Sequence, residues 1–160
     1  MIKIQDLTFC YRESAQPVLQ DISLSIPDGQ FVGITGAAGC GKSSLTYVLN
    51  GIVPHCYPGD FYGSVHVDGL DTCESSLTDL SRLVGSVCQD IESQMVSSIV
   101  EDEILYGLEN FAVPREQIEG RIAQALDDMG IADLRHRAIA GLSGGQKQKV
   151  AIASILALNP

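Results

Sequence analysis

A glycine-rich loop between an apolar segment and a helix-compatible segment is the feature that most constrains this chain. Residues 36–43 read Gly-Ala-Ala-Gly-Cys-Gly-Lys-Ser, which matches the pattern G-x-x-x-x-G-K-[ST]. The apolar residues 31–34 precede the loop, and residues 44–50 follow it with a helix-compatible composition. A strand, a loop and a helix in this order direct backbone N–H groups and the positive end of a helix dipole toward one anion. The pattern therefore predicts a site for the phosphates of a nucleoside triphosphate.

The residue types within this loop suit phosphate chemistry. Its glycines permit the backbone angles that wrap amide N–H groups around the β-phosphate. Lys42 is expected to neutralise charge on the β- and γ-phosphates, and the Ser43 hydroxyl is expected to bind Mg²⁺. A flexible glycine turn is the alternative, but the segments on either side favour the phosphate site. The residues expected to bind nucleotide here are Gly36, Ala37, Ala38, Gly39, Cys40, Gly41, Lys42, Ser43 and Ser44.

Composition and charge exclude several classes of protein. The chain has 160 residues, of which 45% are hydrophobic, so one globular domain is expected. Twenty acidic residues against ten basic residues give a net charge of −10 without a basic stripe, so nucleic acid is not expected as a partner. No apolar run reaches the ~20 residues of a membrane span, and no secretory signal is recognisable, so a cytoplasmic chain is expected. Five cysteines without a C-x-x-C pair indicate reduced thiols rather than a zinc site.

Hydrophobic periodicity predicts strands in the first half of the chain and helices in the second. Alternating or continuous apolar residues predict strands at 2–7, 22–26, 30–35, 63–69 and 83–88. Helices are predicted at 44–50, 98–108, 114–129 and 143–158. Ser98 and Glu101 have the spacing of a capping box at the second of these helices. The acidic run 101–103 is expected to be solvated in the first turn of that helix.

A second glycine motif, Leu-Ser-Gly-Gly-Gln at residues 142–146, precedes the last apolar helix. Ser143 suits the position that caps a helix N-terminus, and Gly144 and Gly145 leave backbone N–H groups accessible. The motif therefore predicts another anion site. An ordinary glycine turn before a helix is the alternative when the motif is considered alone.

Taken together, these motifs resemble those of the ATP-binding-cassette (ABC) ATPases along nearly all of the chain. Residues 36–43 resemble the Walker A loop of that family, and residues 142–146 resemble its signature motif. Gln89 follows an apolar segment and precedes the helical region, where the family has the glutamine of its Q-loop. Tyr11 is positioned like the family's aromatic residue that stacks on adenine, although a strand aromatic without a ligand is the alternative.

The resemblance implies a role for each of these residues. It implies that Lys42 and Gln89 act in ATP hydrolysis and that Ser43 and Gln89 bind Mg²⁺. It implies that Tyr11 contacts the base of ATP. It also implies that a second set of residues in this chain contacts the nucleotide bound to the phosphate loop of a partner subunit. These residues are Ser143, Gly144, Gly145 and Gln146. ATP and Mg²⁺ are the implied cofactors.

The fold implied by the resemblance is α/β: a P-loop NTPase (ABC ATPase) core with an N-terminal antiparallel β subdomain and a helical insert. The implied organisation of residues 1–160 is a partial nucleotide-binding domain, with the β subdomain and Walker A core at 1–89, a helical subdomain at 90–142 and the signature helix at 143–160. The family's Walker B aspartate, catalytic glutamate and switch histidine match no position here. We therefore expect the C-terminal part of the core to be missing, a gap in the central parallel sheet, and marginal stability.

A finer resemblance is to the ATPases of energy-coupling-factor importers, which take up vitamins and metal ions through a separate membrane subunit. It rests on residues 50–55, 94–96, 100–103 and 106–110. It implies a homodimer or heterodimer with a second ABC ATPase domain, a transmembrane partner subunit, and a position at the cytoplasmic face of the cell membrane. Two alternatives stay open: a soluble, non-transport ABC ATPase, and a nucleotide-binding fragment without turnover.

Overall fold

The computed structural model describes all residues, Met1–Pro160, and they form two compact units with separate hydrophobic cores. The first unit is Met1–Val84 and the second is Gly85–Pro160. The elements of the first unit are β1 (Ile2–Tyr11), β2 (Leu19–Ile26), α1 (Lys42–Leu49), α2 (Ile52–His55), β3 (Gly59–Val67), β4 (Leu70–Asp71) and α3 (Leu77–Ser81). Those of the second unit are α4 (Ile91–Gln94), α5 (Val100–Asn110), α6 (Arg115–Asp128), the 3-10 turns η1 (Ala132–Leu134) and η2 (Ile139–Gly141), and α7 (Gly144–Leu158).

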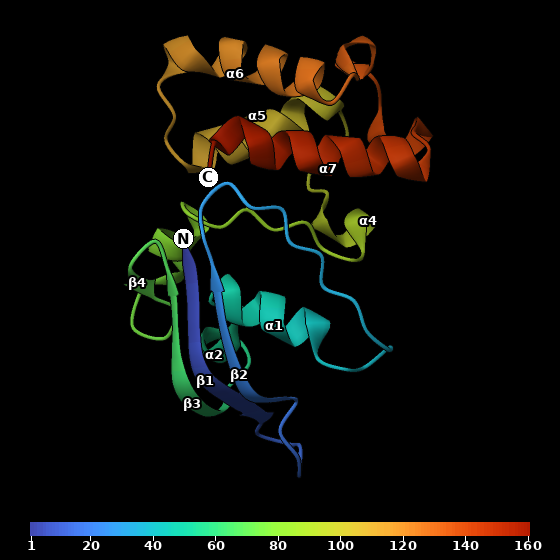
Figure 1. The fold of residues 1–160 in the computed structure, drawn as a ribbon. Helices are drawn as coiled ribbons and strands as arrows, with labels where there is room; N and C mark the ends of the chain where they lie inside the picture. Colours follow the sequence, from blue (N-terminus) through green and yellow to red (C-terminus); the bar gives the residue numbers. More distant parts are fainter. The chain divides into compact units, whose positions relative to one another are not determined.

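An antiparallel sheet with the strand order β2-β1-β3-β4 forms the frame of the first unit (Figure 1). The pairing of β1 with both neighbours is irregular near Asp6, whose φ of 50° marks a bulge. Because the bulge inserts a residue, Ile4 and Leu7 both face the core although they are three positions apart. Leu45 and Val48 of α1 complete this core. The sheet thereby carries the helix that follows the glycine-rich loop.

Two of the five predicted strands are absent, and these predictions are wrong. Residues 30–35 and 83–88 contain no strand and join no sheet. The Phe31 side chain is fully exposed, at 102% of its reference area, and Val32, Ile34 and Val87 are exposed as well. Apolar periodicity indicates which residues can be buried. A strand also needs an adjacent strand with which its backbone can form hydrogen bonds. Neither segment pairs with another strand.

The three longest helices of the second unit, α5, α6 and α7, pack around one core (Figure 1). The apolar face predicted for the helix at 114–129 is confirmed, because Ile122, Ala125 and Leu126 of α6 are buried against α5 and α7. Gly130 ends that helix with a φ of 61°. None of the helices has both the length and the apolar character needed to span a lipid bilayer.

The capping box predicted at Ser98 and Glu101 does not form. The N-cap of α5 is Ile99, and no side chain caps the helix. Instead, the N–H groups of Val100 and Glu101 donate to the carbonyls of Arg137 and Arg135, at 3.1 and 2.9 Å. A backbone segment distant in sequence therefore satisfies the donors that a capping side chain would otherwise satisfy.

Candidate nucleotide site

The glycine-rich loop leads directly into α1, which begins at Lys42. The Lys42 side chain folds back over the loop, where its ammonium group donates to the carbonyls of Gly36 and Ala37 at 3.0 and 2.8 Å. The same nitrogen lies 3.7 Å from Sγ of Cys40. A lysine charge and the positive end of a helix dipole thus act on one exposed loop, which is the arrangement that binds phosphate.

Tyr11 contacts this helix. It ends β1, and its hydroxyl lies 3.0 Å from the Oγ atom of Ser44, a buried residue in the first turn of α1. Phe9 packs edge-on against the Tyr11 ring, with centroids 4.8 Å apart. The structure therefore brings Tyr11 together with the residues that follow the glycine-rich loop.

The loop also fits a nucleotide that carries a divalent cation. Ser43 is exposed in the first turn of α1, next to Lys42. No group of three or more histidine, cysteine or acidic side chains in the chain could hold a metal ion by itself. Mg²⁺ commonly combines few protein ligands with the phosphate oxygens of its substrate. An exposed serine in the first turn of α1 is compatible with such shared binding.

Gln89 lies in a loop of the second unit, and hydrogen bonds fix the residues on both sides of it. On one side, the amide of Gln94 accepts from Cys88 N–H at 2.8 Å and donates to the Ser86 carbonyl at 3.4 Å. On the other side, Asp90 caps α4 by accepting from the N–H groups of Glu92 and Ser93. Gln89 itself is exposed. Sequence reasoning missed the role of Gln94, for which no short motif gives a signal.

The signature-like motif forms a reciprocal capping box at the start of α7. The Oγ atom of Ser143 accepts from Gln146 N–H at 3.3 Å, and Oε1 of Gln146 accepts from Ser143 N–H at 2.9 Å. Gly144 and Gly145 are exposed between them. The serine cap was predicted, whereas the reciprocal contact of Gln146 was missed, although the spacing S-x-x-Q is its signal.

The predicted site residues thus fall into two groups. Tyr11 and the glycine-rich loop with Ser44 belong to the first unit, whereas Gln89 and residues 143–146 belong to the second. Within the second unit, α4 is joined to the start of α7 by an ion pair between Glu92 and Lys147. The segment containing Gln89 is therefore linked to the helix that carries Ser143.

The acidic run 101–103 is not simply solvated, which corrects the expectation from sequence. The Glu103 side chain is buried, with 6% of the residue exposed, and its Oε2 atom accepts from the N–H groups of Val96 and Ser97 at 2.9 and 2.7 Å. Glu101 contacts Arg135 and His136. These carboxylates hold segments of the second unit in place.

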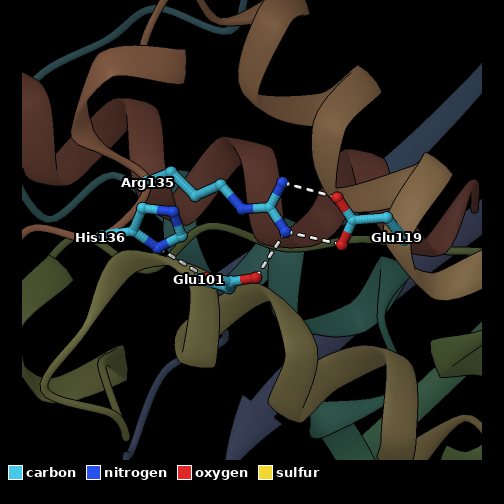
Figure 2. Close-up of polar contacts among 4 residues, drawn as sticks. All are labelled: Glu101, Glu119, Arg135 and His136. Atoms are coloured by element: carbon cyan, nitrogen blue, oxygen red, sulfur yellow. Dashed lines mark hydrogen bonds and ion pairs between the residues drawn. The ribbon is translucent and has the colours of Figure 1, made fainter.

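Arg135 is the centre of a charged cluster that joins α5 to α6 (Figure 2). Its guanidinium donates twice to Glu119, both times at 2.7 Å, and once to Glu101 at 2.5 Å. The other carboxylate oxygen of Glu101 lies 2.9 Å from Nδ1 of His136. Hydrogen bonds from Arg135 lower the pKa of both carboxyl groups and raise the pKa of Arg135 itself. The cluster stabilises the packing of α5, α6 and the chain leading to α7.

This cluster predicts a defined pH dependence of stability. Because the pKa of Glu101 and Glu119 is lower in the folded state than the ordinary 4.5, they contribute stability above pH ~4.5. That contribution is lost as the pH falls below this value. We expect Arg135→Gln to lower the free energy of unfolding at pH 7, and the difference from wild type to shrink below pH 4.5. Urea unfolding across this range, with the exposed Arg137→Gln as control, measures the effect. A difference that is independent of pH would contradict it.

Cys40 provides a second prediction. It is exposed in the loop, whereas Cys73 is half-buried and its pKa is raised to about 11, mainly by burial. Since the thiolate is the reactive form, iodoacetamide should modify Cys40 faster than Cys73. Mg-ATP at ~100 times its dissociation constant should slow modification of Cys40 about a hundredfold and leave Cys73 unchanged. Mass spectrometry of each cysteine measures these rates. Equal rates for the two cysteines without any effect of Mg-ATP would show that the loop is not an accessible phosphate site.

Comparison with known proteins places this arrangement in a family. Residues 19–160 match the family described as ABC transporter. A Methanosarcina acetivorans protein, named as an ABC transporter ATP-binding protein, is 44% identical over the whole chain, which covers 25% of that protein. A Pyrococcus horikoshii protein with the same description is 41% identical over the whole chain, which covers 56% of it.

Solved structures show the same fold. CbiO1 of Clostridium perfringens, described as part of the ABC transporter complex CbiONQ, has a TM-score of 0.87 and 30% identity over 99% of this chain and 62% of its own. The ATP-binding cassette MJ0796, in a dimeric post-hydrolysis state with ADP and Pi, has a TM-score of 0.80 and 25% identity over 100% of this chain and 71% of its own.

This chain belongs to the ABC transporter family. The predicted fold class is confirmed: an antiparallel N-terminal sheet and a helical region align with part of the ABC ATPase core. The chain spans a quarter to just over half of the length of the two relatives named above.

Proposed function

We propose that this chain is the nucleotide-binding part of an ABC importer ATPase of the energy-coupling-factor type, which couples ATP binding and hydrolysis to uptake of a vitamin or a metal ion. The observation that carries the proposal is the glycine-rich loop, with Lys42 folded over it and Tyr11 against the helix that follows. The similarity to CbiO1, described as part of a CbiONQ complex, supports the importer type.

In this proposal each predicted residue has a role. Tyr11 contacts the adenine, residues 36–44 bind the phosphates, and Lys42 balances their charge. Ser43 and Gln89 would hold Mg²⁺, which would supply positive charge against the phosphates when bound. Gln89 also orients the attacking water. Residues 143–146 present N–H groups and a helix N-terminus to the nucleotide of a second cassette.

The proposed partners follow from these roles. A second ABC ATPase domain completes each nucleotide site, and a transmembrane subunit receives the motion through the region around Gln89. The protein would lie at the cytoplasmic face of the membrane. A net charge of −10 disfavours the nucleic-acid partners of the soluble alternative. In the proposed organisation, residues 1–89 form the β subdomain and Walker A core. Residues 90–142 form the helical subdomain, and residues 143–160 form the signature helix.

Complementation between two inactive variants tests this proposal. In the intact protein, Lys42→Ala disables the phosphate loop and Ser143→Arg disables the signature site. Each variant alone should hydrolyse Mg-ATP far more slowly than wild type. A mixture should regain hydrolysis, because a mixed dimer combines one intact loop with one intact signature site. Hydrolysis by Lys42→Ala at the wild-type rate would contradict the proposal.

A further inference from the structure

A series of aromatic rings surrounds Tyr11 in the first unit. Tyr57, in the loop between α2 and β3, lies edge-on to Tyr11 with ring centroids 6.3 Å apart. Tyr57 also stacks on Tyr47 of α1, with centroids 5.9 Å apart and an interplanar angle of 26°. Because Tyr47 covers one face of Tyr57, the orientation of the Tyr57 ring is fixed before any ligand binds. Half of Tyr57 is nevertheless exposed, at 50%.

The exposed part of Tyr57 lines an open pocket. The pocket has a volume of about 630 Å³, and its lining residues are Tyr11, Arg12, Glu13, Tyr57 and Pro58. Backbone contacts hold its two sides together: Arg12 N–H donates to the Pro58 carbonyl at 3.4 Å, and Tyr11 pairs with Gly59 between β1 and β3. The pocket is therefore built on the sheet rather than on free loop ends.

We propose that Tyr57 and Pro58 form a second wall of the nucleobase site, beside Tyr11, and that this wall makes the site prefer purines. The inference rests on the proposed function, because it concerns the base of the nucleotide whose phosphates bind residues 36–44. Tyr11 links the two regions, since its hydroxyl contacts Ser44 in the first turn of α1. One wall of the pocket thus touches the helix that begins at the phosphate loop.

Stacking accounts for the expected selectivity. Aromatic side chains bind bases through their π-faces, and the gain increases with the ring area that is covered. Because the Tyr11 and Tyr57 rings are nearly perpendicular, at 81°, a base that stacks on Tyr11 can meet Tyr57 only with its edge. A purine has two fused rings and extends farther toward Tyr57 than the single ring of a pyrimidine. Tyr57 therefore adds more to the binding of a purine nucleotide than to that of a pyrimidine nucleotide.

Binding measurements on the intact protein test the role of Tyr57. Tyr57→Leu, which keeps an apolar side chain but removes the ring, should weaken Mg-ATP about tenfold. It should weaken Mg-CTP less, and inorganic tripolyphosphate, which has no base, not at all. Tyr57→Phe should retain wild-type affinity for Mg-ATP. Tyr62→Leu, at an exposed tyrosine of β3 outside the pocket lining, serves as the matched control.

The outcomes separate this inference from the proposed function. Wild-type affinity of Tyr57→Leu for Mg-ATP, together with loss of binding in Lys42→Ala, would overturn the role of Tyr57 alone. Equal weakening of Mg-ATP and tripolyphosphate would also overturn it, because the change would then act on the phosphate loop. Failure of the wild-type protein to bind any of the three ligands would overturn the proposed function and this inference together.

Discussion

Replacement of Gly41 by alanine is expected to lower the free energy of unfolding by roughly 2–5 kcal/mol and to abolish nucleotide binding. Gly41 has a φ of 94°, which costs a residue with a side chain ~1–2 kcal/mol. A Cβ atom there would also lie 2.6 Å from the carbonyl oxygen of Val18, a backbone atom that cannot rotate away, and overpacking adds about 1–3 kcal/mol. Urea unfolding and titration with Mg-ATP measure the two effects.

Gly39→Ala is the matched control for this prediction. Gly39 has a φ of 77°, but nothing lies within 4 Å of the Cβ atom that alanine would add. It therefore isolates the backbone cost, ~1–2 kcal/mol. Equal destabilisation by the two variants would show that the contact with Val18 does not constrain the loop.

Glu103→Ala should destabilise the second unit by about 2–3 kcal/mol. Its carboxylate accepts two backbone hydrogen bonds, and hydrogen bonds to a charged group contribute ~1.5–3 kcal/mol. Loss of both leaves the N–H groups of Val96 and Ser97 without their partner. Hydrogen exchange at these two amides should accelerate strongly, and urea unfolding measures the free energy.

Asp102→Ala removes the neighbouring carboxylate, which is exposed in the same helical turn. Surface substitutions of this kind change stability by about 0.5 kcal/mol or less. If Glu103→Ala were no more destabilising than Asp102→Ala, and exchange at Val96 and Ser97 were unchanged, Glu103 would not hold this segment.

Local motifs could be predicted from the sequence where the residues that form hydrogen bonds with each other are close along the chain. Ser143 was correctly expected to cap a helix, because its hydroxyl finds Gln146 three positions later. Ser98 and Glu101 show the same spacing, yet no capping box forms. Glu101 instead pairs with Arg135, which is 34 positions away and gives no local signal. Of these two similar motifs, the one whose acidic residue has a distant partner therefore does not form a capping box.

The errors in the predicted strands have a related cause. Residues 30–35 have the composition of a strand, but a composition does not supply a pairing partner, and none is present in either unit. The candidate site was easier to predict, because the glycines of residues 36–43 and the helix that follows them determine the shape of the loop locally. The contact between Tyr11 and Ser44 depends on how α1 packs on the sheet that contains β1. No short sequence pattern encodes this packing.

The loop at residues 36–43 is expected to bind Mg-ATP through Lys42. Isothermal titration of the intact protein with Mg-ATP tests it most directly, with Lys42→Ala and the exposed Lys149→Ala compared with wild type. A hydrogen-bonded charge contributes ~1.5–3 kcal/mol, so Lys42→Ala should weaken binding about 10- to 100-fold, whereas Lys149→Ala should bind like wild type. Wild-type affinity in Lys42→Ala, or an equal loss in both variants, would show that the Lys42 side chain does not bind the phosphates.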